Sequence, residues 1–337
     1  MDQAVHGQKG DTGEMTVAYA AYHQDRDIRM NSSSGGVFYA LAAEVIRDGG
    51  VVFGVRFDNL FHAVCDAAET LEDLIRFQGS KYVYPDLRGV DARIRGFLEQ
   101  GRTVLFTGLP CHAAGMRGSL MRQGCRTERL ICVDVVCHGT PAPGVWESYL
   151  RYESERGNGI AGIRMRDKTA GWADYRITIT DRDGAVRSEP AVKNIYMRGY
   201  VRNLYLRETC YHCRFRGVER RTDLTLGDYW GVSARHRDLD TEKGVSLILA
   251  HTRQGEELLK AAAEELVCVR TDPDYACACN PAVVQSPDLP GSRRIILDRI
   301  RSGEAFSECV RSGIRYSPQE RFRALCRKVR DKMHKRK

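Results

Sequence analysis

The sequence lacks the long apolar segments that would place it in a membrane or send it out of the cell. No stretch reaches the roughly 18 apolar residues of a membrane-spanning helix. The best candidate, residues 35–55, is interrupted by Glu44, Arg47 and Asp48. The first 15 residues are polar and have no apolar centre of the kind found in a signal peptide. We therefore expect a cytoplasmic protein without a membrane span.

An excess of positive charge is also lacking over most of the chain. The whole sequence has 52 Lys and Arg against 44 Asp and Glu, a net charge of +8. Residues 321–337 contain nine Lys and Arg and a single acid, Asp331, so this segment alone accounts for the excess. The rest has no basic groove interleaved with aromatic residues, which argues against a nucleic-acid partner. A basic end of this kind is more typical of a solvated helix or a docking patch.

The remaining composition is that of a globular protein, with 42% hydrophobic and 28% charged residues in a chain of 337. We expect residues 1–15 to form a flexible leader and residues 291–337 a basic helical tail. Residues 16–290 read as one compact unit, made of an N-terminal region (16–100) and a C-terminal region (101–290).

Apolar strand patterns alternate with helical patterns through much of this unit. Strands are indicated at 51–57, 103–107 and 130–136, and helical patterns follow the second and third of them directly. This alternation predicts an α/β fold with a mixed, largely parallel sheet and helices on both faces. Residues 160–192 instead show strand after strand with an Asp183-Gly184 turn signal, which predicts an antiparallel β insertion.

Twelve cysteines in a chain without a signal peptide are expected to be reduced thiols that pack, bind metal or do redox chemistry. Cys210 and Cys213 form a CxxC pair flanked by Arg207, Arg214 and Arg216, and nearby cations favour the thiolate that metals bind.

Cys111 and Cys137 each follow an apolar strand inside a loop rich in Gly and Pro. Two small residues that close tight turns would explain them equally well. Together with Cys210 and Cys213 they form a plausible set of four thiolates for an iron–sulfur cluster. Zinc fits the same chemistry, although structural zinc more often uses two local pairs and this chain offers one.

Two polar loops are candidates for binding a phosphate-bearing cofactor. Residues 32–36 (SSSGG) open a helix after a strand, where hydroxyls and helix amides can cradle a phosphate, although a simple serine cap is the plainer alternative. Residues 79–82 (GSKY) combine a turn, a cation and an aromatic ring, a combination equally common on ordinary surfaces. Asp228 interrupts an apolar strand, so it either pairs with an arginine or faces a site.

At these residues the sequence resembles the beta-subunit family of coenzyme F-420 hydrogenases and dehydrogenases, over about residues 17–286. The motifs that carry the resemblance are SSSGGVF (32–38), GGVVFGVRFD (49–58), GSKYV (79–83), FTGLPCH (106–112), CHGTPAPGVW (137–146), YMRGY with NLYLRETCYHCRF (196–215) and DLTLGDYWG (223–231).

The resemblance implies a flavoprotein in which FAD lies beside a 4Fe–4S cluster. The cluster ligands would be Cys111, Cys137, Cys210 and Cys213. The flavin would be bound by Ser32, Ser33, Ser34, Gly35, Gly36, Gly79, Ser80, Lys81, Tyr82, Thr107 and Gly108. Lys81 and His112 are the candidates for stabilising reduced flavin or delivering a proton.

The sequence departs from the family pattern in three places. It has no cysteine before Cys65, so it lacks the cysteines of the N-terminal ferredoxin-like module that many members carry. His112 replaces a usual glutamine, and Tyr84-Pro85 replaces a more usual Gln-Ser. These changes leave the substrate open, and coenzyme F-420 itself is not implied.

We therefore predict an oxidoreductase that relays electrons through FAD between a ferredoxin-like one-electron carrier, or a partner subunit, and a two-electron acceptor that is a small molecule. Two alternatives stay open: a non-catalytic electron-transfer subunit of a larger complex, and a zinc-stabilised nucleotide-binding protein without redox activity.

Overall fold

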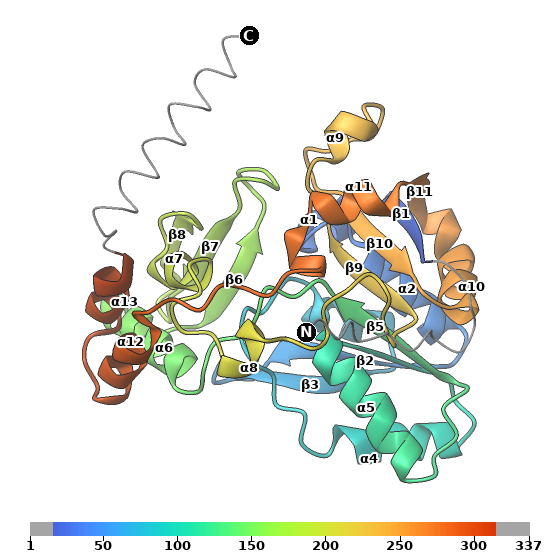
Figure 1. Cartoon of the computed structure of the whole chain (residues 1–337), viewed down its shortest axis with the longest axis horizontal. Helices are drawn as coiled ribbons and strands as arrows, with labels where there is room; N and C mark the ends of the chain where they lie inside the picture. The colour runs from blue at the N-terminus through green and yellow to red at the C-terminus, as the bar shows by residue number, and fades with distance from the viewer. Residues whose placement is uncertain (1–15, 315–337) are drawn as a thin grey trace, which may run out of the picture.

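The computed structural model describes residues 16–314, which form two sheets with helices packed around them (Figure 1). The larger sheet has eight strands in the order β11-β1-β10-β9-β5-β4-β2-β3. Its strands are β1 (Val17–His23), β2 (Val51–Phe57), β3 (Ala63–Ala68), β4 (Val104–Gly108), β5 (Leu130–Val135), β9 (Leu224–Asp228), β10 (Ser246–Ala250) and β11 (Leu266–Thr271).

The four central strands of this sheet, β2, β4, β5 and β9, are parallel to one another. The outer strands β3, β10, β1 and β11 pair antiparallel with their neighbours. The carboxyl ends of β4, β5 and β9 therefore meet at one edge, which is where ligands bind in sheets of this kind.

Alternate residues of the parallel strands point to opposite faces of the sheet and enter different cores. Leu105 of β4 packs in a core with α2 (Val37–Arg47) and α10 (Arg253–Ala261). Its neighbours Val104 and Phe106 pack instead with α4 (Val90–Glu99) and α5 (Pro110–Arg122). Helices thus cover both faces of the sheet.

The smaller sheet is antiparallel and consists of β6 (Gly162–Asp167), β7 (Arg176–Thr180) and β8 (Val186–Pro190). It shares a second hydrophobic core with four helices, α6 (Val145–Arg156), α7 (Ile195–Tyr200), α12 (Arg293–Arg301) and α13 (Phe306–Ile314). Figure 1 shows this second unit at the left, beside the eight-stranded sheet.

Short helices complete the described chain: α1 (Arg26–Asn31), α3 (Leu71–Leu74), α8 (Glu208–Tyr211), α9 (Val232–Arg235) and α11 (Pro273–Ala278). Within residues 16–314 no helix combines the length and the apolar character needed to cross a bilayer.

The mixed α/β fold with a parallel centre, helices on both faces and an antiparallel insertion is confirmed. The expected leader (1–15) and the basic residues 321–337 lie outside the described residues. The described part of the expected tail forms α12 and α13, which pack on α6 and α7 in the second core.

Candidate functional site

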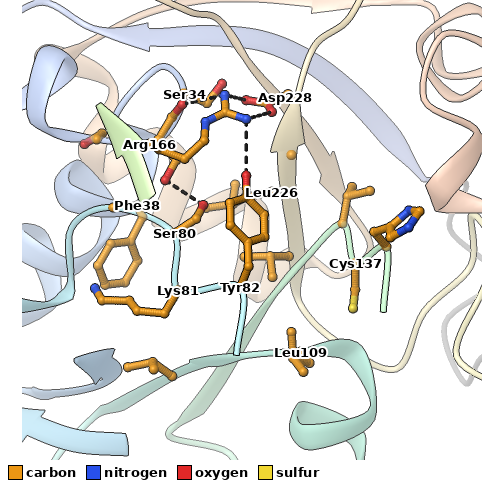
Figure 2. A pocket seen from close by; sticks show the side chains of 18 of the residues that line it. Ser34, Phe38, Ser80, Lys81, Tyr82, Leu109, Cys137, Arg166, Leu226 and Asp228 are labelled. Carbon is orange, nitrogen blue, oxygen red and sulfur yellow. Dashed lines mark hydrogen bonds and ion pairs between the residues drawn. The ribbon is translucent and has the colours of Figure 1, made fainter. Parts of the chain in front are cut away.

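A cavity of about 510 Å³ lies at the carboxyl ends of β4, β5 and β9, where the sheet faces the second unit (Figure 2). Its walls come from the loop before α2, from residues 77–83, from the loops after β4, β5 and β9, and from the β6–β8 insertion. Lining residues include Ser32, Ser33, Ser34, Gly36, Val37, Phe38, Gly79, Ser80, Lys81, Tyr82, Thr107, Gly108, Cys137, Arg166, Tyr175, Asp228 and Trp230. Of the residues predicted to bind the flavin, all except Gly35 lie on this wall.

The serine–glycine loop leads into α2, and the first residues of this helix lie on the cavity wall. Gly36 has a φ of +88°, which favours glycine, and α2 starts with no side-chain cap. Gly36, Val37 and Phe38 line the cavity, so the unbonded N–H groups of the first turn are available to an anion there.

The three serines of this loop bond to the protein itself rather than standing free. Ser32 donates to the carbonyl oxygen of Ile28 at 2.8 Å, and Ser34 donates to that of Val245 at 2.9 Å. The hydroxyls of Ser33 and Ser80 share a hydrogen bond of 2.7 Å, which joins the two predicted flavin loops. The serines therefore shape the loop, and the helix amides are its open donors.

Lys81 lines the cavity, but its ammonium group holds the loop that carries it. It donates to the carbonyl oxygens of Arg76, Phe77 and Gln78 at 3.2, 3.1 and 2.8 Å. Burial lowers the pKa of Lys81 to about 7. In Figure 2 its side chain extends beside Phe38 and away from Cys137.

Arg166 of β6 lines the cavity from the insertion, and nothing in the sequence pattern singled it out. Its guanidinium pairs with the Asp228 carboxylate at 3.1 and 3.2 Å and donates to the Ser33 carbonyl at 3.0 Å. It also lies 4.2 Å from the centre of the Tyr175 ring. Burial opposes its charge, but Tyr82 and Asp228 hold the pKa of Arg166 above its ordinary value.

Asp228 meets both predictions made for it from the sequence, pairing with an arginine and facing a site. It forms the ion pair with Arg166, and it also lines the cavity. The indole N–H of Trp172 donates to it at 3.1 Å, and the Trp172 ring stacks on Trp230, with ring centres 4.7 Å apart. The insertion and the end of β9 together therefore supply one polar and aromatic end of the cavity.

Lys168, two residues beyond Arg166, is a second residue that the sequence pattern did not reveal. Its side chain is almost completely buried, and its ammonium donates to the carbonyl oxygens of Arg29, Ser34 and Lys243 at 2.6, 2.7 and 2.7 Å. Because Ser34 lies in the serine–glycine loop, Lys168 ties the insertion to that loop.

The four predicted cluster ligands come from three separate segments. Cys111 is the second residue of α5, which begins at the end of β4, and Cys137 follows β5 on the cavity wall. The loop after Cys137 pairs with the segment before Cys210: the amide of Arg207 donates to the Thr140 carbonyl at 2.8 Å. The Thr140 hydroxyl lies 3.8 Å from the Cys210 sulfur.

Electrostatic interactions connect Cys111 with Cys210 and Cys213, and Cys137 with Cys111 and Cys210. The pKa of Cys111 is raised to about 11 by burial and by the thiol groups of Cys213 and Cys210. Burial raises the pKa of Cys137 to about 12; Arg216 opposes the shift, while Cys111 and Cys210 add to it. Cys111, Cys210 and Cys213 do not line the cavity, so Cys137 is the member of the group that faces it.

Within residues 16–314, no group of three or more His, Cys, Asp or Glu side chains is arranged to hold a single metal ion. A 4Fe–4S cluster makes a different demand, because each of its four thiolates binds a different iron. Its ligands therefore stand further apart than those of one ion.

Arg216 fixes the backbone around these four cysteines. Its guanidinium donates to the carbonyl oxygens of Cys137 and Ala282, and to that of His138 at 2.9 Å. One side chain thus joins the loop after β5 to the segment before α12 and brings a positive charge close to Cys137.

His112 follows Cys111 in α5 and does not line the cavity. Neither ring nitrogen of this buried imidazole has a hydrogen-bond partner among the described residues. Its ring meets Tyr84 edge-on, with centres 4.9 Å apart, and the Arg207 guanidinium lies 4.1 Å from the centre of the same tyrosine. Burial, reinforced by Arg207, lowers the pKa of His112 to about 4.

Residues 101–274 match the family model for the C-terminal part of the beta chain of coenzyme F420 hydrogenase/dehydrogenase. The match covers the loops of Cys111, Cys137, Cys210 and Cys213. The chain belongs to this beta-subunit family of electron-transfer oxidoreductases, as the sequence motifs predicted.

A solved chain from the F420-reducing [NiFe] hydrogenase complex of Methanosarcina barkeri, studied by xenon derivatization, has a similar fold. The TM-score is 0.53 at 15% sequence identity, and the alignment covers 84% of this chain and 91% of the other. A search of curated protein sequences finds no match.

Proposed function

We propose that this chain is an iron–sulfur flavoprotein subunit that passes electrons between a one-electron carrier and a two-electron acceptor. The observation that carries the proposal is the position of Cys137, which belongs both to the cavity wall and to the group of four thiols. A cofactor bound in the cavity beside Cys137 is therefore also beside the thiol group. When bound, a flavin exchanges electrons singly or in pairs, whereas a cluster carries them singly.

The chain's own residues fit FAD in the cavity. The first turn of α2 offers free amides to a diphosphate, and Phe38, Tyr82 and Tyr175 supply aromatic surface. The buried Arg166 keeps one N–H, at Nε, without a partner among the described residues. The role of these residues is to bind and orient the cofactor and to exclude water from it.

The charges around the four cysteines suit an iron–sulfur cluster. Burial raises the pKa of Cys111 and Cys137 far above neutrality, so both are protonated in the metal-free protein at pH 7. Metal binding displaces those protons and removes the cost of burying thiolates. Arg216 and the amides at the start of α5 are positioned to stabilise the resulting negative charge.

The solved relative belongs to a multi-subunit hydrogenase complex. We propose that this chain also works with a partner, either a companion subunit or a separate ferredoxin-like carrier, and that the two-electron acceptor is a small molecule.

Anaerobic purification followed by a visible spectrum, before and after dithionite, tests this function. We expect flavin and cluster absorption that bleaches on reduction, with about one FAD and about four iron atoms per chain. A colourless protein without iron contradicts the proposal, and zinc with a featureless spectrum selects the nucleotide-binding alternative. A chain that holds both groups but reduces no small acceptor is a non-catalytic electron-transfer subunit.

A further inference from the structure

The loop that carries Cys210 and Cys213 lies at the molecular surface. Both cysteines are half-buried, and their neighbours Thr209, His212 and Arg214 are exposed. Cys137 instead faces the cavity. The thiol group therefore has one side towards the cavity and one side towards the exterior of the described chain.

Exposed apolar side chains surround this loop. Tyr84 and Phe215 are each 41% exposed, Val284 is 43% exposed and Leu289 is 53% exposed. Hydrogen bonds hold their segments together: the Cys213 amide donates to the Ser286 hydroxyl at 3.1 Å, and the Gly217 amide donates to the Val283 carbonyl at 2.9 Å. We call this region, with its two arginines, the 207–215 surface; it consists of Tyr84, Arg207, Arg214, Phe215, Val284 and Leu289.

The charge of this region is positive. Residues 207–216 contain three arginines and one glutamate. Among the described residues, no carboxylate forms an ion pair with Arg207 or Arg214, although Glu208 and Asp288 lie in the same segments. Arginine next to exposed aromatic and aliphatic side chains is the composition typical of protein interfaces.

We propose that the 207–215 surface is the docking site of a small acidic one-electron carrier protein. This inference rests on the proposed function. Single electrons pass between proteins only when the two redox centres come close, and this surface is the exposed approach to the thiol group. The unpaired arginines favour a carrier with negative charge around its own centre. The modest apolar area suits the brief, small interfaces of electron-transfer partners.

The test uses the holoprotein and a purified acidic ferredoxin, with a basic cytochrome c as the carrier of opposite charge. We expect reduced ferredoxin to reduce the bound cofactors with a rate constant that falls as salt is added. The double variant Arg207→Glu/Arg214→Glu should lower that rate constant by about tenfold or more. The same variant should transfer electrons to cytochrome c at least as fast as the wild type.

The matched control is Arg122→Glu/Arg126→Glu, which makes the same change in net charge at exposed arginines near the far end of α5. It should change the ferredoxin rate by less than about twofold. The docking site is refuted if both double variants lose the same part of the ferredoxin rate constant, or if Arg207→Glu/Arg214→Glu loses none of it. It is also refuted if the wild type reacts faster with cytochrome c than with ferredoxin.

Iron, flavin and the extent of reduction by excess dithionite are measured on every variant. If Arg207→Glu/Arg214→Glu has normal iron, flavin and extent of reduction but an unchanged ferredoxin rate, the docking site is refuted and the proposed function stands. A wild-type protein without flavin or iron refutes both. If the double variant loses iron, Arg214→Glu alone is used, because that side chain is exposed.

Discussion

In the proposed function, the four thiols bind an iron–sulfur cluster, which the chain itself does not supply. Cys111 and Cys137 are poor ligands when metal-free, because burial favours their protonated forms. Neighbouring thiols add to the raised pKa of both residues, and four thiolates held close together repel one another unless positive charge lies between them. This mutual dependence predicts that losing one ligand affects the whole group.

We expect Cys213→Ser to reduce the iron content to less than about half of the wild-type value, because a serine hydroxyl is a much weaker iron ligand than a thiolate. Cys213 does not line the cavity, so FAD should be retained. Iron analysis and flavin extraction on one anaerobic sample measure both. Cys125→Ser, at a half-buried cysteine outside the group, is the control. Wild-type iron in Cys213→Ser would remove Cys213 from the ligand set.

A second residue-scale prediction concerns pH and a histidine distant from the thiol group. His251 shares hydrogen bonds with Thr225 at 2.8 Å and Thr16 at 3.2 Å. Burial, with a smaller contribution from Arg220, lowers the pKa of His251 to about 3. The unfolded chain, with an ordinary histidine pKa of about 6.5, therefore binds a proton that the folded chain rejects.

Because the unfolded state binds more protons between about pH 6.5 and pH 3, the free energy of unfolding falls as pH falls through this window. At pH 5 the loss attributable to His251 is about 2 kcal/mol relative to pH 7. His251→Gln should remove that part of the pH dependence, measured by urea unfolding at both pH values, while His62→Gln at an exposed histidine should not. Identical pH profiles for His251→Gln and wild type would contradict the assignment.

At the scale of elements, the sequence predicts local structure well and strand neighbours poorly. The parallel strands and the insertion follow from hydrophobic periodicity and turn residues, and the structure bears them out. The place of β1 between β10 and β11 does not follow, because its partners lie more than 220 residues away and no local pattern encodes that pairing. The sequence does not reveal Arg166 and Lys168 as site residues for the same reason. Alternation indicates that β6 is a strand but not that this strand borders a cavity.

The start of α2 gives a prediction at this scale. A Cβ on Gly35 would collide with the carbonyl oxygen of Ala21 in β1 and come within 2.9 Å of the Ser246 amide in β10. Gly35→Ala must therefore push the serine–glycine loop away from the sheet, at a cost of about 1–3 kcal/mol, and weaken FAD binding. Urea unfolding and flavin titration measure the two effects.

Gly96→Ala in α4 is the matched control, because a Cβ there meets nothing within 4 Å. It should stabilise the protein by about 0.5–1 kcal/mol, since alanine is the better helix former, and leave FAD binding unchanged. Equal behaviour of the two alanine variants would show that the loop tolerates displacement and that its position does not determine flavin affinity.

At the scale of the whole molecule, the cavity lies where the eight-stranded sheet meets the second unit, whose core also includes Ala63 of β3. On the side of the eight-stranded sheet, the start of α2 supplies its helix amides and the loop after β5 supplies Cys137. The second unit supplies Arg166 and Tyr175. Ligand affinity therefore depends on how firmly the units are held together. Lys168 is one of the residues that joins them, through three carbonyl oxygens that no strand pairing satisfies.

We expect Lys168→Met to loosen this junction, because it keeps most of the side-chain volume but removes all three donors and leaves buried carbonyls without a partner. The free energy of unfolding should fall by about 2–3 kcal/mol. FAD should bind at least about tenfold more weakly in titrations run well below the unfolding temperature, since 1.4 kcal/mol corresponds to a factor of ten. Lys193→Met makes the same change in charge and shape at an exposed position and should do neither. If Lys168→Met lowers stability but binds FAD as tightly as Lys193→Met, the lysine supports the fold without setting the width of the cavity. The flavin affinity would then depend on the sheet and its serine–glycine loop alone.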